Sequence, residues 1–507
     1  REGRYFTPWD VNNKNIQYFK LPQIIHNIDK QSYTGFGNYI IEFEDIKIGF
    51  ELCEEIWSID PMYIDLYKKG VDIILNSSGS HTQLHKLNER IDLIKSATKH
   101  GGCYVYSNQI GCDGSRLYYD GCSCIVQNTD MYAQASQFSV KQVEVVTATL
   151  DLSRSISKQI SMKSSCHQKS VASSCEVIEF SCYLCHNNYA MLSNIIEPKY
   201  HEPMEEIALG PAVWLWDYLR KSKLGGFFLP LSGGSDSAST ALIVYSMCNI
   251  LKENFFDLQN KDIVHYNLNP SDTTKDICGK IFYTAYMASV NSSEETKSLA
   301  NRLAEQIGSN HNEINIDKIT SAVMEETNHL FKQSPKFKAN GGTEKENLAL
   351  QNIQARSRMV LSYYLAQLLS ENNLLVLGSG NIDELLRGYL TKYDCSSADI
   401  NPIGSICKTD IFAFLEWCSQ KFNINVVSEI RSAPPTAELE PITSEYKQTD
   451  EDDMGFTYED LSHMGKLRKI ERLGPVGMFR RLCYEHNDIK HNVKNTLDKV
   501  KRFFKYY

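Results

Sequence analysis

The chain has 507 residues, more than one hydrophobic core normally serves, so two to four domains are expected. A hydrophobic fraction of 42% and a charged fraction of 23% are those of a soluble globular protein, and no apolar run is long enough to span a membrane. The net charge of −9 argues against a general nucleic-acid binder.

Fifteen cysteines, an odd number, are scattered through apolar segments such as those around Cys248 and Cys418. This usage indicates reduced thiols in a cytoplasmic protein rather than a disulfide framework. One cluster of metal-ligand residue types has a single C-x-x-C pair and no second pair at a zinc-site spacing: Cys166, His167, Cys175, Cys182, Cys185 and His186. We expect a surface loop with free thiols here, and a zinc site is the weaker alternative.

The first part of the chain alternates between strand and helix patterns. Apolar residues at every second position predict a strand over 45–53 that ends at Cys53. Further strands are predicted over 71–75, 103–106, 123–127 and 143–150, and a helix over 84–99. The serine- and cysteine-rich residues 153–181 have weak periodicity, so a connecting segment is expected there.

From residue 202 onward the patterns become longer. An amphipathic helix containing Ile207, Trp214 and Leu219 is predicted to lead into an apolar strand over 227–231, and another helix follows. A helix over 348–369 and a strand over 374–377 come later. Strands that alternate with long helices predict an α/β fold with a doubly wound parallel sheet. The domain boundary is expected near residue 198, giving domains 1–198 and 199–507.

The turn after the strand at 227–231 is polar and rich in glycine: Ser232, Gly233, Gly234, Ser235, Asp236 and Ser237. A strand, a tight turn and a helix N-terminus form an anion cradle, because unpaired N–H groups and the helix dipole face the ligand. The Asp236 carboxylate is suited to Mg²⁺. No Gly-Lys-Ser/Thr follows, so this is not a Walker loop. The stretch resembles the SGGxDS loop of ATP pyrophosphatases, which release pyrophosphate from ATP and form an adenylate.

Cys53 lies at the end of a predicted strand, where a thiol is exposed and can act as a nucleophile. Downstream are the segments 76–80, 108–109 and 119–121. Together they resemble the nitrilase-like glutaminase domain of eukaryotic two-domain glutamine-dependent NAD⁺ synthetases. The resemblance implies that Cys53 attacks the amide of glutamine, forms a thioester and releases ammonia. It also implies that Ser80, Lys86 and Glu54 bind the glutamine.

The family's catalytic triad also needs a glutamate and a lysine, and residues 1–9 resemble a motif that follows that lysine. Both residues are therefore expected upstream of Arg1, and the nitrilase-like α-β-β-α sandwich is expected to be incomplete. Lys14 and Glu42 have no spacing that supports them as substitutes. A polypeptide that begins at Arg1 is accordingly expected not to hydrolyse glutamine.

The second half contains a series of motifs in the order known from NAD⁺ synthetases, at 352–356, 378–384, 388–394, 398–403, 408–409 and 435–439. The resemblance covers essentially the whole chain. It implies a Rossmann-like sheet of the ATP pyrophosphatase type. The implied ligase adenylates the carboxylate of deamido-NAD⁺ with ATP and then amidates it with ammonia from glutamine.

The resemblance also implies roles for individual residues. ATP contacts fall on Pro230, Leu231, Ser232, Gly233, Gly234, Ser235, Asp236, Ser237, Ser379, Lys408 and Thr436, with Ser232 also catalytic. Deamido-NAD⁺ contacts fall on Asn352, Arg356, Glu384, Lys392 and Asp399. Asp236 and Glu384 would bind Mg²⁺. The implied protein is a homo-oligomer, for which an octamer is one arrangement, with an internal ammonia tunnel and neither nucleic-acid nor membrane partners.

Two remaining segments have simpler interpretations. The acidic run 449–453 is expected to be a solvated loop, and a second Mg²⁺ site is the alternative. Val493, Leu497, Val500 and Phe504 follow helical spacing and predict a surface helix on the ligase core. Alternative functions are another SGGxDS amidotransferase, a tRNA-modifying pyrophosphatase, and a scaffold with a dead amidase half.

Overall fold

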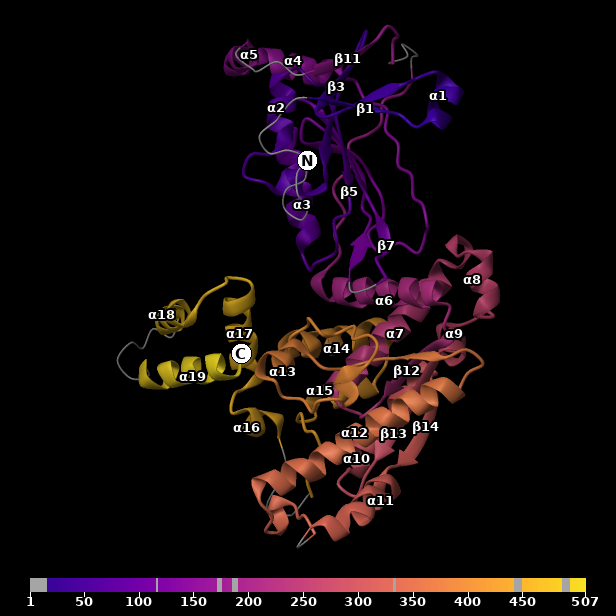
Figure 1. Cartoon of the computed structure of the whole chain (residues 1–507), viewed down its shortest axis with the longest axis vertical. Helices are drawn as coiled ribbons and strands as arrows, with labels where there is room; N and C mark the ends of the chain where they lie inside the picture. The colour runs from indigo at the N-terminus through magenta and orange to yellow at the C-terminus, as the bar shows by residue number, and fades with distance from the viewer. Residues whose placement is uncertain are drawn as a thin grey trace. The chain divides into compact units, whose positions relative to one another are not determined.

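The computed structural model describes residues 16–114, 117–170, 176–184, 190–331, 334–441, 449–485 and 493–507. The chain divides into two compact units, Arg1–Pro203 and Met204–Tyr507 (Figure 1). The motif at 1–9 and Lys14 lie outside the described residues, as do Cys175, Cys185 and His186. None of the described helices is long and apolar enough to cross a bilayer.

The first unit is built on a seven-stranded sheet of order β10-β9-β6-β5-β4-β3-β11. Its strands are β3 (Tyr39–Phe43), β4 (Lys47–Leu52), β5 (Ile73–Ser78), β6 (Cys103–Asn108), β9 (Cys124–Gln127), β10 (Asp130–Gln134) and β11 (Glu176–Phe180). The three central strands β4, β5 and β6 are parallel, so their carboxyl ends meet at one edge. Cys53 follows β4 directly and therefore lies at that edge, as predicted.

Helices and two small sheets complete this unit. The helix predicted over 84–99 is present as α3 (Lys86–Ala97), which buries Leu87, Ile91 and Ile94 against the sheet. The other elements are α1 (Gln23–Asp29), α2 (Met62–Lys68), the 3-10 helix η1 (Cys53–Trp57), and the strand pairs β1 (Gln17–Lys20) with β2 (Tyr33–Phe36) and β7 (Ile110–Cys112) with β8 (Tyr118–Asp120).

Two predictions for this unit are wrong. The strand expected over 143–150 is absent: the residues alternate in exposure there, but they form no β-ladder. The expected connecting segment contains α4 (Ser153–Ser161), α5 (Lys163–Ser170) and β11. The inward residues of α4 are polar: Gln127 Nε2 donates to Ser155 Oγ at 2.9 Å, and Gln159 Nε2 donates to the Gly101 carbonyl at 3.1 Å. The apolar residues of α4, Ile156 and Ile160, are exposed, so no buried apolar face marks this helix.

The second unit contains a four-stranded parallel sheet of order β14-β13-β12-β15, with β12 (Gly226–Pro230), β13 (Phe282–Ala288), β14 (Asn310–Asn315) and β15 (Leu374–Val376). Both faces of β12 are covered, because Phe227, Phe228 and Leu229 are all fully buried. Phe228 packs with Met359 of α12 (Glu344–Leu368) on one face. On the other side, α7 (Ser235–Glu253) and α9 (Thr274–Ile281) contact β12. The mixed α/β fold class is confirmed.

The remaining helices surround this sheet and extend from it (Figure 1). They are α6 (Pro203–Ser222), α8 (Asn260–His265), α10 (Glu294–Ile307), α11 (Asp317–Thr327), α13 (Ile382–Arg387), α14 (Lys408–Phe422) and α15 (Val426–Ser432). The domain boundary expected at 198 precedes α6, and the division into units falls at the first residues of α6.

A helical cluster follows, formed by α16 (Asp450–Met454), α17 (Tyr458–Lys469), α18 (Pro475–Glu485) and α19 (Val493–Tyr506). These helices share a core that includes Leu461, Met478 and Val500, so the predicted C-terminal helix is present. The expectation of a solvated acidic loop is wrong for Asp450. It begins α16, is 7% exposed, and accepts a hydrogen bond from Tyr458 OH at 3.1 Å.

Candidate active sites

The polar turn of the second unit connects β12 to α7 and has the geometry of an anion cradle. The Ser232 N–H donates to Ser237 Oγ at 3.2 Å, and the two hydroxyl oxygens lie 2.9 Å apart. Gly233 has a φ of +80°, and a Cβ there would lie 2.2 Å from the Thr296 carbonyl oxygen. Glycine is therefore required at this position by both conformation and space. The first turn of α7 directs its N–H groups toward the turn.

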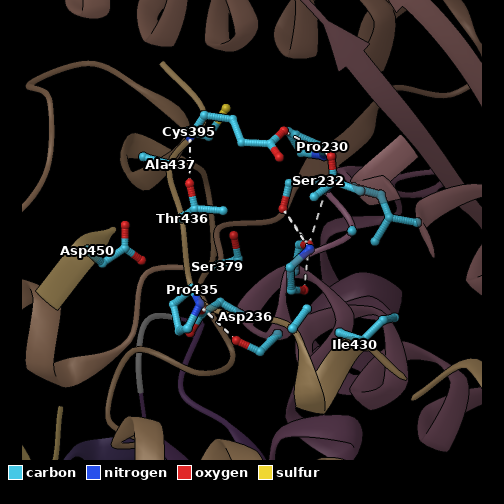
Figure 2. A pocket seen from close by; sticks show the side chains of 18 of the residues that line it. Pro230, Ser232, Asp236, Ser379, Cys395, Ile430, Pro435, Thr436, Ala437 and Asp450 are labelled. Carbon is cyan, nitrogen blue, oxygen red and sulfur yellow. Dashed lines mark hydrogen bonds between the residues drawn. The ribbon is translucent and has the colours of Figure 1, made fainter. Parts of the chain in front are cut away.

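The turn forms one wall of a cavity of about 320 Å³. The whole segment 230–237 lines this cavity, together with Ser379, Lys408 and Thr436. Figure 2 shows Ser232, Asp236, Ser379 and Thr436 around the same space. The structure thus brings together every residue for which the sequence predicted an ATP contact, from segments that are up to about two hundred residues apart.

Two carboxylates in this cavity converge on one amide. Asn381 Nδ2 donates to Asp236 Oδ1 at 2.9 Å and to Glu384 Oε1 at 2.8 Å. Lys408, which is 1% exposed, forms an ion pair with Asp236 Oδ2. Tyr458 OH, which donates to Asp450, also lies 3.1 Å from Glu384 Oε1. The cavity floor is therefore a concentrated acidic site with one buried ammonium group.

The electrostatics of this floor follow from burial and crowding. Burial, and next the Asp236 carboxylate, raise the pKa of Glu384 from its usual 4.5 to about 8. Burial likewise raises the pKa of Asp450. Burial alone would lower the pKa of Lys408, but the nearby Asp236 and Glu384 carboxylates raise it above its usual range. The site holds more carboxyl groups than one lysine can neutralise, so an additional cation would be stabilised here.

The residues predicted to contact deamido-NAD⁺ divide into two groups. Glu384 lines the cavity, whereas Asn352, Arg356, Lys392 and Asp399 do not. Asn352 Oδ1 accepts from Thr391 Oγ1 at 2.6 Å, and Arg356 Nε donates to the Lys392 carbonyl at 2.9 Å. Asp399 accepts from the backbone of β15, at Val376, and from Tyr363 OH. Asn352 and Arg356 therefore hold the turn that contains Lys392, whereas Asp399 is fixed to β15 and to α12.

Cys53 in the first unit has a strained backbone that Asn76 holds in place. The φ of Cys53 is +49°, which is uncommon for a residue with a Cβ. Its N–H donates to Asn76 Oδ1 at 3.0 Å, and Asn76 Nδ2 donates back to its carbonyl at 3.4 Å. The side chain of Asn76 also donates to Tyr104 OH at 2.8 Å. This clamp fixes the direction in which the thiol leaves β4.

The residues predicted to bind glutamine lie on η1, on α3 and just after β5. Lys86 Nζ lies 3.9 Å from the buried Glu54 carboxylate and 5.4 Å from the ring centroid of Trp57. Ser80 is fully buried, and its N–H donates to Asn108 Oδ1 at 2.8 Å. The structure thus brings Glu54 and Lys86 together, whereas the side chain of Ser80 is enclosed.

The described part of the chain contains no group of three or more His, Cys, Asp or Glu residues arranged to hold a metal ion. Of the cysteines considered for zinc, Cys166 and Cys182 are exposed free thiols. Cys166 lies within α5, so the expected surface loop is wrong at that residue, whereas Cys182 follows the end of β11.

Comparison with known proteins gives consistent matches. The NAD synthase family matches residues 211–475, and the carbon-nitrogen hydrolase family matches residues 19–158. The chain is 47% identical over 524 residues to the glutamine-dependent NAD(+) synthetase of Dictyostelium discoideum, covering 100% of this chain and 73% of the relative. The chain belongs to the glutamine-dependent NAD(+) synthetase family. The human family member is 48% identical over 525 residues, with 100% and 74% covered.

Solved structures of this family share the fold. A glutamine-dependent NAD(+) synthetase from Cytophaga hutchinsonii superposes with a TM-score of 0.70 at 23% identity, covering 99% of this chain and 71% of that one. As a member of the glutamine-dependent NAD(+) synthetase family, the protein is an ATP-using carbon–nitrogen ligase with a nitrilase-like amidase unit.

The sequence assigned no role to Arg358 or Glu438, which line the synthetase cavity, and considered Asp450 only within the alternative Mg²⁺ site of the acidic run. Arg358 comes two residues after the predicted Arg356, and its Nε donates to the Met287 carbonyl at 3.0 Å. Burial lowers the pKa of its guanidinium group. The register of β12 and β13 pairs Pro230 with Ala285, which brings Met287 level with Ser232. Only this long-range pairing reveals that Arg358 lies beside the polar turn.

Proposed function

We propose that the second unit activates the carboxylate of deamido-NAD⁺ with ATP and that ammonia then completes the amide of NAD⁺. A carboxylate oxygen attacks the α-phosphorus of ATP, and the bond to pyrophosphate breaks. Ammonia attacks the carbonyl carbon of the adenylate, and AMP leaves. The observation that carries this proposal is the single cavity lined by the polar turn, by Glu384 and by Lys408.

The chemistry of this cavity suits phosphoryl transfer. Negative charge shifts among the phosphate oxygens, so fixed donors and cations matter more than a protein base. We assign the donors to the backbone of the turn and to the hydroxyls of Ser232 and Ser237. Lys408 and Arg358, which both line the cavity, supply positive charge. Thr436 and Ser379 are assigned to the remainder of ATP.

We further propose that Asp236 and Glu384 hold Mg²⁺. The donor set fits the ion, because both groups are carboxylates and both accept from the same Asn381 amide. The raised pKa of Glu384 reflects burial and nearby negative charge, which a cation would relieve. When bound, Mg²⁺ supplies charge neutralisation of the phosphates and orients them. Lys408 stays within reach of Asp236 and limits the excess negative charge.

The second group of residues is assigned to the dinucleotide. Asn352 and Arg356 hold the turn at 391–392 through hydrogen bonds, and the exposed Lys392 side chain is available to the substrate. We propose that Lys392 contacts deamido-NAD⁺, while Asp399 keeps this region attached to β15.

For the first unit we propose that Cys53 is the nucleophile of glutamine hydrolysis. The thiolate attacks the side-chain amide carbon of glutamine, ammonia leaves, and water hydrolyses the thioester to glutamate. Glu54 directly follows Cys53 in the chain and pairs with Lys86, and we assign both side chains to the charged end of glutamine. The enclosed Ser80 acts through its backbone, which pairs with Asn108.

Family resemblance supports three further proposals: a homo-oligomer, a cytoplasmic location, and transfer of ammonia between the two sites without release. Ammonia released to water at neutral pH becomes ammonium, which is not nucleophilic, so an enclosed route would preserve its reactivity. Glutamine labelled with ¹⁵N in its amide, mixed with unlabelled ammonium at a concentration too low to support synthesis by itself, tests the transfer, because an enclosed route delivers the ¹⁵N to NAD⁺ undiluted.

One assay tests the main proposal. The protein is incubated with deamido-NAD⁺, Mg²⁺-ATP and either ammonium or glutamine, and NAD⁺ and pyrophosphate are measured. Formation of both products in equal amounts from ammonium is the expected result. ATP turnover to ADP and phosphate, or no NAD⁺ with ammonium, would contradict the adenylation chemistry.

A further inference from the structure

A chain of hydrogen bonds ends on the sulfur of Cys53. Ser78 Oγ donates to Cys53 Sγ at 3.5 Å. Tyr106 OH in turn donates to Ser78 Oγ at 2.7 Å. Because the Tyr106 proton occupies the Ser78 oxygen, the Ser78 proton is directed at the sulfur. The hydrogen bonds therefore run in one direction, from Tyr106 to Ser78 and from Ser78 to the Cys53 thiol.

The hydroxyl groups of Ser78 and Tyr106 both belong to buried side chains on adjacent strands. Ser78 is the last residue of β5 and is 7% exposed, and Tyr106 on the adjacent strand β6 is 1% exposed. The Arg90 guanidinium lies 5.6 Å from the centroid of the Tyr106 ring and forms two hydrogen bonds with Asp120. A hydroxyl placed this rigidly keeps its direction without losing conformational entropy on each reaction cycle.

Several charged groups on the elements around η1 make hydrogen bonds to atoms other than the Cys53 sulfur. The titratable groups on the elements around η1 include Glu51 on β4, Glu54 and Glu55 on η1 itself, Asp65 and Lys68 on α2, and Lys86 and Arg90 on α3. Glu51 accepts from Tyr104 OH and from the Tyr63 backbone, and Glu55 accepts from the Leu52 N–H. Among the hydrogen bonds of the described residues, the one from Ser78 is directed at the Cys53 sulfur itself.

We propose that Ser78 is a catalytic residue of glutamine hydrolysis and that Tyr106 is its positioning residue. The hydroxyl keeps its own proton and donates a hydrogen bond that stabilises the thiolate before it attacks. When the carbon–sulfur bond of the thioester forms, the sulfur loses its negative charge and this hydrogen bond weakens. The same group then favours return of the thiolate after hydrolysis. This inference rests on the proposed role of Cys53.

The test is the rate at which iodoacetamide alkylates Cys53, followed by mass spectrometry of its peptide between pH 6 and pH 10. The exposed Cys182 serves as an internal reference. Loss of a hydrogen bond to a charged sulfur should slow alkylation of Ser78→Ala by about tenfold at pH 7. The rate at high pH, where the thiol is ionised in both proteins, should change by less than about twofold. Ser77→Ala, an exposed neighbour on the same strand, is the matched control and should match the unmodified protein.

Tyr106→Phe provides a second variant with little change in volume. Tyr106→Phe should also slow alkylation of Cys53 at pH 7, by a smaller factor than Ser78→Ala. Ser78→Thr retains a hydroxyl group and should alkylate at nearly the rate of the unmodified protein. An unchanged profile in Ser78→Ala overturns the inference, and so does a lower rate at every pH, which indicates a structural role. If Ser78→Ala fails to fold, the profile of Tyr106→Phe decides. Glutamine-dependent synthesis by Cys53→Ala tests the nucleophile separately.

Discussion

Asp236 has two competing partners, because Asn381 donates to one of its oxygens and the Lys408 ammonium pairs with the other. A cation that arrives with ATP would compete with Asn381 and Lys408 for this carboxylate. Replacing Asp236 by asparagine removes the charge of the side chain and preserves its shape. The substitution therefore tests the electrostatic role of Asp236 without changing the packing around it.

We expect Asp236→Asn to reduce ammonia-dependent NAD⁺ synthesis by at least about a hundredfold, because the amide removes the charge proposed to hold Mg²⁺. The Glu384 carboxylate remains near Lys408, so the fold should be retained. Steady-state rates at saturating Mg²⁺ measure the loss, and circular dichroism monitors the fold. Turnover near that of the unmodified protein would exclude Asp236 from metal binding.

Glu384 leads to a prediction on pH. Its carboxyl pKa is raised to about 8 in the folded protein by burial and by Asp236. The folded state therefore holds a proton that the unfolded chain releases near pH 4.5, and stability falls as the pH rises from about 4.5 to 8. Glu384→Gln removes this dependence. Without ligands, we expect the variant to match the original at pH 4 and to exceed it by at least about 1 kcal/mol at pH 8.

Thermal unfolding of both proteins at the two pH values checks this prediction. Other carboxyl groups titrate in both chains, so the difference between them isolates Glu384. A difference that does not grow with pH would show that Glu384 ionises normally in the folded state.

At the scale of elements, the link between β12 and α7 depends on one glycine. Gly233→Ala places a Cβ at 2.2 Å from a backbone oxygen of α10, at a φ of +80°. We expect a loss of about 2–4 kcal/mol in the free energy of unfolding and at least a tenfold weaker ATP affinity, because the turn must shift. Denaturant unfolding and calorimetric ATP binding measure the two effects.

Gly341→Ala is the matched control for this substitution. Gly341 has a φ of +83°, and a Cβ there meets nothing within 4 Å. It should cost only about 1 kcal/mol, the conformational part, and leave ATP affinity unchanged. Equal effects of the two substitutions would mean that the contact with Thr296 is unimportant.

The elements that sequence patterns predicted are those with local signals. The apolar run of β12 and the glycines after it are contiguous, so the strand, the polar turn and the helix that follows were predicted together. By contrast, α4 packs through Ser155 and Gln159, and β11 is an exposed edge strand. The residues of the expected strand at 143–150 alternate in exposure, but ladder formation also requires a neighbour with free backbone groups.

The candidate site in the second unit likewise combines residues with a local sequence signal and residues that only tertiary packing brings together. The acidic and glycine-rich residues of the turn were predicted because they are adjacent in the chain. The ion pair of Lys408 with Asp236 joins residues 172 positions apart. The burial of Asp450 and the position of Arg358 depend likewise on tertiary packing, for which a charge run or a single arginine carries no signal.

At the scale of the whole molecule, the two proposed reactions belong to separate compact units. We therefore expect Cys53→Ala in the full-length protein to abolish glutamine-dependent synthesis while changing the ammonia-dependent rate by less than about twofold, because only thioester formation requires the thiol. Parallel assays with the two nitrogen donors measure this. Equal losses with both donors would assign Cys53 a structural role.

The seven-stranded sheet also has a consequence for synthesis on the ribosome. β3 pairs in parallel with β11, although more than a hundred residues lie between Phe43 and Glu176. At roughly 5–20 residues per second, the edge of β3 waits on the order of 10 s for its partner to emerge. During that interval the nascent chain presents an unpaired strand edge, which other polypeptides can join. Slow codons between these strands would lengthen the exposure and lower the yield of folded enzyme.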